Sequence, residues 1–345
     1  MRDEPDALEP YDALRRIAYL LERSRAGTYR VKAFRGAAAT VLATDPIELR
    51  SRAAVGTLGD LPGIGPATEA VIRGTLEGET PEYLKSLEEK ATEPLVAGGL
   101  EVRAALRGDL HSHSDWSDGG SSIQEMTVTV IELGHDYLVL TDHSPRLKIA
   151  NGLSPERLSQ QLGVIDEINS AVQDFRLLKG IEVDILDDGS LDQSVEMLAR
   201  LDLRVASVHS KLGMSSAPMT RRMVAAAANP QTNVLGHCTG RLVEGSRGTR
   251  GQSSFNAVAV FEACATNGVA VEINARPERC DPPDELVALA LDTGCLFSID
   301  SDAHAPGQLD FLSYGCDRAE RLGVPLERIV NTWEMNRLLA WANPV

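Results

Sequence analysis

The chain has 345 residues, which exceeds one typical domain but hardly provides two large ones. A hydrophobic fraction of 43% indicates a globular protein, and no apolar run approaches the ~20 residues needed to cross a bilayer. The N-terminus, MRDEPDALEP, is acidic and lacks the apolar stretch of a secretory signal. The five cysteines lie far apart without a CxxC pair, which favours reduced thiols over a disulfide framework. These features predict a cytoplasmic protein with no membrane partner.

The net charge of −16 argues against a general nucleic-acid coat protein, yet the charge is uneven. Residues 13–52 hold nine basic side chains and three acidic ones, which leaves +6 on a segment of a strongly acidic chain. This asymmetry points to a polyanionic partner for the N-terminal part. A solvated helix surface is the alternative interpretation.

Residues 11–90 are expected to be helical, because apolar residues such as Leu14, Ile17 and Leu21 recur at a spacing of three and four. No alternating run of β-branched residues occurs before residue 100. The Glu/Lys-rich stretch Ser86–Glu93 and the pair Gly98–Gly99 predict a linker. We therefore expect a small all-α domain over residues 1–95.

From residue 107 onwards, short apolar runs alternate with helical segments. This alternation predicts a parallel sheet with helices outside it. The predicted strands end near Leu110, Leu140, Val183, Val208, Gly236, Ile273 and Ile299. Seven such units suit a closed barrel better than an open sheet. The predicted fold class is therefore α/β, with a barrel over residues 107–345.

Histidines follow these strands. Six of the seven histidines stand at strand ends: His111, His113, His143, His209, His237 and His304. Because a barrel directs the carboxyl ends of its strands to one face, these residues are expected to converge. Alternate residues of an extended strand point to the same side, which applies to the HxH step and to Asp302 with His304. The seventh histidine, His135, precedes the second strand and is expected at the opposite rim in a structural role.

Imidazoles and carboxylates together suit zinc, manganese or iron, and the lack of cysteine disfavours a structural zinc–thiolate site. One ion cannot bind so many groups, so we expect two or three divalent ions per chain. A carboxylate such as Glu182 can bridge two ions, and such a site activates water for attack on phosphorus. Asp109 and Asp142 are candidates to orient an imidazole, with turn roles as the alternative. Asp184 and Asp300 are expected to be structural.

Seven blocks of the sequence resemble the PHP (polymerase and histidinol phosphatase) family, and most nearly the PHP domain of bacterial X-family DNA polymerases. The blocks are DLHSHSDWSDG (109–119), TDHS (141–144), GIEVDIL (180–186), SVHS (207–210), GHCTGRL (236–242), EINARPER (272–279) and DSDAH (300–304). The resemblance covers residues 107–342. It implies a distorted (βα)7 barrel with a trinuclear site that holds manganese or zinc.

The resemblance also implies a set of metal ligands. Carried over by motif position, they are His111, His113, Asp118, His143, Glu182, His209, His237, Asp302 and His304. Asp118 enters only through the SDG step of the first block. Cys238 stands where the family commonly has proline, which leaves the preceding ligand intact. Glu182, His143 and Asp302 are the residues expected to act in catalysis.

The N-terminal part is similar to the first two elements of the same polymerases. Residues 29–43 resemble a small helical lyase-type domain, and residues 58–72 resemble a helix-hairpin-helix. Backbone N–H groups at the Gly63–Gly65 turn suit a DNA phosphate, with Arg30, Lys32 and Arg35 as supporting cations. An ordinary turn between helices is the alternative.

The resemblance predicts a phosphoesterase that acts on DNA ends, as a 3′→5′ exonuclease or a 3′-end-processing phosphodiesterase. A histidinol-phosphatase-like phosphomonoesterase is the alternative, favoured by the acidic barrel, and a non-catalytic DNA-binding adaptor is the third hypothesis. Residues 91–107 leave no room for a polymerase palm and thumb, so a separate DNA polymerase is a candidate partner beside DNA. After the fifth strand, Arg241, Arg247 and Arg250 are candidates to meet phosphate, with a surface-loop role as the alternative.

Overall fold

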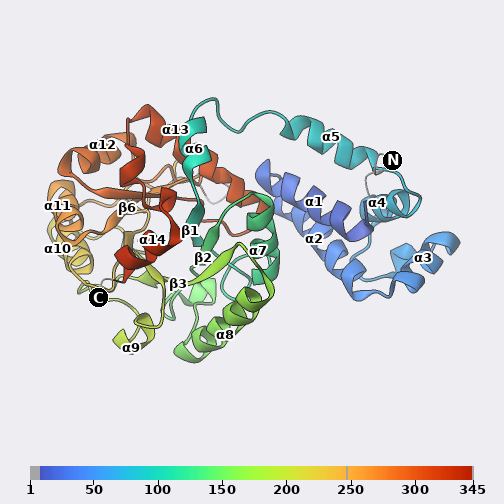
Figure 1. Ribbon diagram of the computed structural model, residues 1–345, viewed down its shortest axis with the longest axis horizontal. Helices are drawn as coiled ribbons and strands as arrows, with labels where there is room; N and C mark the ends of the chain where they lie inside the picture. The colour runs from blue at the N-terminus through green and yellow to red at the C-terminus, as the bar shows by residue number, and fades with distance from the viewer. Residues whose placement is uncertain (1–7, 246–247, 344–345) are drawn as a thin grey trace. The chain divides into compact units, whose positions relative to one another are not determined.

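The chain is described by a computed structural model, which covers residues 8–245 and 248–343. It divides into two compact units, Met1–Pro94 and Leu95–Val345. The described part of the first unit is all helical, and the second unit holds the strands (Figure 1). No helix in the described ranges is long and apolar enough to cross a membrane.

The first unit consists of helices packed around the apolar face of the amphipathic α1. These elements are α1 (Pro10–Arg23), α2 (Thr28–Ala43), α3 (Pro46–Val55), the 3-10 turn η1 (Leu58–Asp60), α4 (Pro66–Leu76) and α5 (Glu82–Ala91). A proline stands at the start of α1, α3 and α4, where the backbone N–H has no partner within the helix and its absence loses no hydrogen bond. Leu14, Ile17 and Leu21 form the buried stripe of α1, which packs on α2, α4 and α5.

The linker prediction was wrong for residues 86–91, which are the second half of α5. Glutamate, lysine, leucine and alanine are strong helix formers, and Leu84 anchors α5 with a buried side chain. The polar composition of residues 86–91 therefore reflects the exposed face of a helix and not a linker. The irregular segment between α5 and the next helix begins at Thr92.

The second unit contains a seven-stranded parallel sheet in the order of the sequence. Its strands are β1 (Gly108–Ser112), β2 (Tyr137–Leu140), β3 (Arg176–Asp184), β4 (Leu203–Ser207), β5 (Val234–Leu235), β6 (Ala270–Asn274) and β7 (Leu296–Asp300). Beyond the regular ladders, a parallel bridge joins Ser112 to Ala303, and His113 N–H donates to the Ala303 carbonyl at 2.8 Å. The sheet is thus a nearly closed barrel, which confirms the predicted fold.

Helices alternate with these strands, as the sequence predicts. They are α6 (Leu100–Ala105), α7 (Ile123–Glu132), α8 (Pro155–Ala171), α9 (Val195–Leu198), α10 (Ser216–Ala227), α11 (Ala257–Asn267), α12 (Asp284–Thr293), α13 (Leu312–Arg321) and α14 (Met335–Ala342), with 3-10 turns η2 (Lys148–Ala150), η3 (Pro306–Phe311), η4 (Leu326–Arg328) and η5 (Val330–Thr332). Ser122, Ser154 and Ser194 cap the helices that follow β1, β2 and β3.

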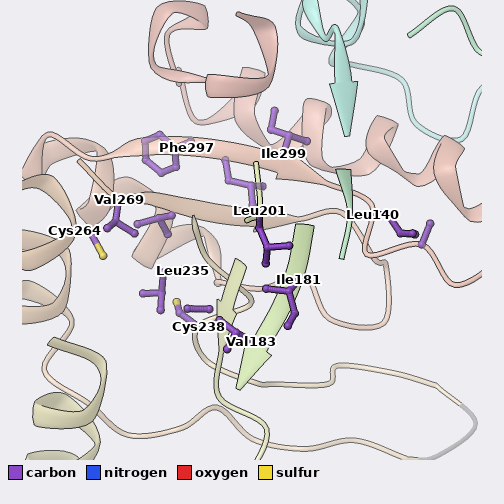
Figure 2. Packing of buried hydrophobic residues seen from close by; sticks show 14 of the residues in the cluster. Leu140, Ile181, Val183, Leu201, Leu235, Cys238, Cys264, Val269, Phe297 and Ile299 are labelled. Atoms are coloured by element: carbon purple, nitrogen blue, oxygen red, sulfur yellow. The ribbon is translucent and has the colours of Figure 1, made fainter. Parts of the chain in front are cut away.

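Two apolar layers hold the barrel. The outer layer fills the space between strands and helices, and Figure 2 shows its members Ile181, Val183 and Phe297. The inner layer is a floor across the barrel interior, formed by residues such as Val139 and Val205. Because side chains alternate along a strand, the interior positions above this floor are free to carry polar groups.

An irregularity in β1 sets which side chains enter the barrel. The pairing of β1 with β2 shifts by one residue between Asp109 and Ser112. Leu110 belongs to the inner floor, yet the next residue, His111, also reaches interior carboxylates. Consecutive residues of a regular strand point to opposite faces, so the extra residue of a β-bulge accounts for both pointing inward.

Candidate metal centre

The carboxylate of Glu182, near the end of β3, lies among five imidazoles. Its Oε1 is 2.8 Å from His237 Nε2 and 3.1 Å from His209 Nε2. Its Oε2 is 2.8 Å from His143 Nδ1 and 3.3 Å from His111 Nε2, and His113 Nε2 lies at 3.6 Å. The two oxygens therefore face different imidazoles, an arrangement suited to a carboxylate shared by two cations.

Two further carboxylates extend this cluster. Asp302 Oδ1 is 3.4 Å from His113 Nε2 and 4.0 Å from His111 Nε2. Asp118 Oδ1 is 3.4 Å from both His143 Nε2 and His304 Nε2. The structure thus brings together all nine predicted ligands, although the sequence spreads them from residue 111 to residue 304.

Ligand atoms gather in three overlapping groups, within each of which all atoms lie within 4.8 Å of one another. The groups are His113, Asp118, His143 and His304; His111, His113 and Asp302; and His143, Glu182 and His209. His237 belongs to none of the three but touches Glu182. Groups that share members are what a site for several ions requires, while nitrogen and oxygen donors suit more than one metal.

The cluster is buried on most sides and exposed to solvent at one edge. Glu182, Asp302, His111 and His113 are buried, whereas the side chains of His304 and Asp118 are 21% and 36% exposed. The cluster is therefore accessible to solvent at Asp118 and His304.

Many buried polar atoms of the cluster have no hydrogen-bond partner in the described structure. They are His111 Nε2, both nitrogens of His113, His143 Nδ1, Glu182 Oε2, both nitrogens of His209 and His237 Nδ1. A buried polar atom without a partner costs on the order of 1–3 kcal/mol. Four of these nitrogens, His111 Nε2, His113 Nε2, His143 Nδ1 and His209 Nε2, face the Glu182 carboxylate within 3.6 Å. The residues present therefore fit bound metal ions, which would satisfy these atoms together.

The electrostatics of the cluster favour positive charge near Glu182. Burial alone would raise the pKa of Glu182, but the neighbouring imidazoles, led by His209, hold it well below its usual range. Burial opposes protonation of His143, but Glu182 and Asp118 outweigh it and raise its pKa to about 10. In contrast, burial lowers the pKa of His113, and the charges of its neighbouring imidazoles add to that effect. The site therefore attracts cations without holding every histidine protonated.

Glu272 is a site residue that the sequence analysis missed. It lies on β6 and is fully buried. Its Oε1 accepts a hydrogen bond from His111 Nδ1 at 2.6 Å, and its Oε2 accepts from the backbone N–H of His237 at 2.5 Å. With Nδ1 donating, His111 presents the lone pair of Nε2 to the cluster. The pattern Glu-Ile-Asn on a predicted strand could have revealed Glu272. Side chains alternate along a strand, and Glu272 stands two residues after Ala270, which faces the barrel interior.

Two arginines between β6 and α12 were also missed. Arg279 Nε donates to Asp302 Oδ2 at 3.0 Å. Arg276 Nη1 lies 2.9 Å from His304 Nδ1 and donates to the Asp302 carbonyl at 3.1 Å. Asp302 itself has a φ of 50°, which is uncommon for a residue with a side chain. These contacts fix Asp302 in that conformation beside the cluster.

The other predicted aspartates have mixed roles. Asp142 accepts hydrogen bonds from Ser114, Ser117 and Gln161, which is the turn role rather than the orientation of an imidazole. Asp109 likewise accepts hydrogen bonds from the backbone N–H groups of His111 and Ser301.

Asp184 and Asp300, both expected to be structural, bond to backbone. Asp184 accepts from the His209 N–H at 3.1 Å and also lies 3.5 Å from His209 Nδ1, so it touches the cluster. Asp300 accepts from the Leu110 N–H at 3.2 Å. His135 precedes β2 and belongs to none of the three ligand groups.

The residues predicted to bind DNA lie in the helical unit. Arg30 and Lys32 are exposed on α2. Arg35, by contrast, forms a bidentate ion pair with the buried carboxylate of Glu22, with both nitrogen–oxygen distances 2.8 Å. This pair already engages its guanidinium, which favours a structural role for Arg35.

The segment predicted as a hairpin forms a turn between η1 and α4. Gly63 has a φ of 75°, which suits glycine. The Gly65 N–H donates to Thr68 Oγ1 at 2.9 Å, and the Ile64 N–H donates to the Leu61 carbonyl at 3.2 Å. These two donors are therefore satisfied within the turn, contrary to the expectation that they are exposed. A role of the hairpin in DNA binding stays a prediction.

Comparison with known proteins agrees with this arrangement. Residues 109–276 match the family model described as "PHP domain". The chain is 38% identical over 226 residues to the "DNA polymerase/3'-5' exonuclease PolX" of Bacillus subtilis (strain 168), a match that covers 66% of this chain and 39% of that protein. It is 24% identical over 233 residues to a "Probable phosphatase" of Syntrophotalea carbinolica, covering 65% of this chain and 90% of that protein.

A solved structure of histidinol phosphate phosphatase from Lactococcus lactis, complexed with zinc, L-histidinol and phosphate, aligns with a TM-score of 0.43 and 17% identity. That alignment covers 63% of this chain and 92% of the other. The family match spans seven of the nine predicted ligands, from His111 to His237, whereas Asp302 and His304 lie beyond it. Residues 109–276 of the barrel therefore form a PHP domain, the domain of a family of metal-dependent phosphoesterases.

Proposed function

We propose that this chain is a metal-dependent phosphodiesterase that acts on DNA ends, as a 3′→5′ exonuclease or a 3′-end-processing enzyme. The observation that carries the hydrolytic part is the convergence of six imidazoles and three carboxylates with unpartnered buried atoms. The DNA part is supported by the 38% identity to a protein named as a polymerase and 3′–5′ exonuclease. The exposed Arg30 and Lys32 of the helical unit support it as well.

Two or three ions, of manganese, zinc or iron, would supply Lewis acidity towards the phosphate ester and an activated water. Glu182 would hold more than one ion, because its two oxygens face different imidazoles. Asp118 and His304 form the open edge through which a phosphate ester approaches. Arg276 and Arg279 hold Asp302 and His304 in place. Glu182, His143 and Asp302 are the proposed catalytic residues.

A small-molecule phosphomonoesterase is the second candidate. The acidic chain, with a net charge of −16, would repel a long polyanion outside the basic segment. The chain also matches 90% of a relative named as a probable phosphatase. The same residues would serve such a reaction, because the cluster determines the bond that is hydrolysed and not the size of the substrate.

One experiment separates these candidates. Purified protein with Mn²⁺ is given labelled single-stranded and gapped DNA, histidinol phosphate and an aryl phosphate. The comparison proteins are a chain without residues 1–94 and the full-length double variant Arg30→Ala/Lys32→Ala. Shortened DNA that is lost or reduced in both comparison proteins supports the nuclease. Monoester turnover indifferent to both changes, without shortened DNA, overturns it in favour of the phosphatase.

A DNA-binding adaptor with a structural metal cluster is the third candidate. It would prevail if the wild type hydrolysed no phosphate ester while His111→Ala/His113→Ala abolished folding. A cytoplasmic location and a separate DNA polymerase as partner stay predictions of the same proposal. Cell fractionation and co-purification from the native host test them.

A further inference from the structure

Eight cations lie in the loops that follow the carboxyl ends of the strands. They are Arg146, Lys148, Lys211, Arg241, Arg247, Arg250, Arg276 and Arg279. Because the cluster also lies at the carboxyl ends of the strands, a polyanion bound there would lie near these loops. Which of the cations are free to bind a phosphate is therefore decided by what each side chain already contacts.

Most of the described cations are engaged within the protein. Arg241 donates to the carbonyls of Arg279 and Cys280, and Arg250 donates to the carbonyl of Gly240. Lys211 pairs with Asp187. Arg276 and Arg279 contact His304 and Asp302. Arg247 lies outside the described residues. Arg241 and Arg250 were predicted as candidate phosphate contacts. In the structure, both donate hydrogen bonds to backbone carbonyls of the loops.

Arg146 and Lys148 are the exception. Both are exposed, and within the described ranges neither side chain has a hydrogen bond or an ion pair, although Arg146 interacts electrostatically with Asp187. Between Lys148 and the helix that follows stands Ile149, with a side chain 96% exposed. Two exposed cations and an exposed apolar side chain therefore share residues 144–153, which we call the mouth loop.

The mouth loop is anchored to the cluster at both ends. It starts directly after His143, and the Leu153 N–H donates back to the His143 carbonyl at 2.7 Å. The Arg146 N–H donates to Asp192 Oδ2 at 2.6 Å. Asn151 Nδ2 donates to the carbonyl of Trp116 at 3.0 Å, two residues before Asp118. The loop is thus braced beside the open edge of the cluster.

The anchoring also makes the loop compact. Arg157 Nη1 donates to the Asn151 carbonyl at 2.8 Å, and Arg157 also bonds the Trp116 carbonyl. A Cβ on Gly152 would lie 1.9 Å from the Ser144 carbonyl oxygen, so the two ends of the loop are in contact. A rigid loop can present Arg146, Lys148 and Ile149 without paying an ordering cost on binding.

We propose that the mouth loop binds the strand of DNA next to the scissile phosphate, with Arg146 and Lys148 on backbone phosphates and Ile149 against a base. Proteins that bind single strands combine cations that follow the backbone with apolar side chains on which bases pack. A small phosphate ester lacks the neighbouring nucleotides that such contacts require. The loop therefore selects polymeric over small substrates. This inference rests on the proposed function.

The test compares kcat/KM for a labelled single-stranded oligonucleotide and for bis(p-nitrophenyl) phosphate, a small diester, with Mn²⁺. For Arg146→Ala/Lys148→Ala, we expect roughly a tenfold loss on the oligonucleotide and no change on the small diester. The slope of log kcat/KM for the oligonucleotide against log[salt] should become less steep by about 1.4. Each phosphate contact with a single strand contributes about 0.7 to that slope. Ile149→Ala should lower oligonucleotide turnover roughly fivefold.

The control is Arg176→Ala/Arg221→Ala, which removes the same charge from exposed positions at the start of β3 and on α10. It should leave both substrates unchanged. Equal oligonucleotide turnover in the mouth-loop variant and the wild type overturns the inference, and so does a parallel loss on both substrates. A wild type that cleaves the small diester but no oligonucleotide overturns the proposed function itself, and the inference with it.

Discussion

Glu182 organises the candidate metal centre, and the residues behind it decide how firmly the centre is held. Glu272 is the clearest such residue, because it contacts His111 through the ring nitrogen that faces away from Glu182. It also holds the backbone of His237. A partner of this kind fixes the tautomer and raises the basicity of the ligand, so its removal affects the metal before it affects the substrate.

We therefore expect Glu272→Gln to weaken metal binding by roughly 10- to 100-fold. The shape of the side chain is kept, while the charge that supports the His111 ring is lost. Calorimetric titration of the metal-free protein with Mn²⁺ or Zn²⁺ measures the affinity. Glu262→Gln, on an exposed face of α11, is the matched control. Unchanged affinity in Glu272→Gln would show that the contact is only structural.

His135 gives a prediction about pH that is independent of the metal centre. Burial lowers its pKa from 6.5 to about 4, and the charge of Arg103 acts in the same direction. The folded protein therefore holds this proton less tightly than the unfolded chain does. The stability that the neutral ring contributes is complete above pH 6.5 and is lost as the pH falls towards 4.

The comparison is between the wild type and His135→Gln. Relative to the variant, the wild type should lose on the order of 2 kcal/mol of unfolding free energy between pH 7.5 and pH 5. Urea unfolding followed by tryptophan fluorescence measures this, because all three tryptophans lie in the barrel unit. Other titrating groups act on both proteins and cancel. A difference that does not vary with pH contradicts the prediction.

At the scale of elements, the barrel interior is narrow, and glycines make room where strands approach. A Cβ on Gly180 would lie 2.4 Å from Val139 Cγ1 and 2.8 Å from the Leu140 carbonyl oxygen. Gly180 is on β3, two residues before Glu182, and so shares its inward face. The absence of a side chain at this position allows β2 and β3 to hold Glu182 where it meets the imidazoles.

Gly180→Ala should therefore destabilise the barrel by about 1–3 kcal/mol and shift Glu182. Urea unfolding gives the first effect, and phosphate-ester turnover with Mn²⁺ gives the second. Gly163→Ala in α8 is the matched control, because a Cβ there meets no atom within 4 Å. That change should be neutral or stabilise the helix by about 0.5–1 kcal/mol. If both variants behaved alike, the space around Gly180 would not be limiting.

At the scale of the whole molecule, the two units should respond differently to metal. Chelation removes ions from the barrel, and the imidazoles and carboxylates around Glu182 lose the ligand that binds only the folded state. At a metal concentration of 100 times Kd, the stabilisation of the barrel is about 2.7 kcal/mol. The helical unit holds none of the three ligand groups.

Hydrogen exchange in the full-length chain measures both units at once. After EDTA treatment, peptides from β3, β4 and β6 should exchange faster, while those from α1 and α2 should not change. Mn²⁺ or Zn²⁺ should restore protection in the barrel. Equal changes in both units would contradict a metal site confined to the barrel, and the absence of any change would contradict the site itself.

The sequence by itself determined the seven strand–helix units and the histidines that end the strands, because strand position and side-chain parity are local properties. It also predicted a helical unit before the barrel, although the polar half of α5 read as a linker. Asp118 was predicted as a ligand only from the family motif, because hydrophobic periodicity does not single out this residue.

Only the tertiary structure decided which polar groups meet. Glu272 joins the site because closure of the barrel brings β6, the neighbour of β7, within reach of His111 after β1. Arg241 leaves the list of phosphate contacts because a neighbouring loop uses its guanidinium. The bulge in β1 likewise turns His111 inward. Such contacts depend on closure of the barrel and on the paths of its loops. No local pattern encodes them, because each joins residues that are far apart in the chain.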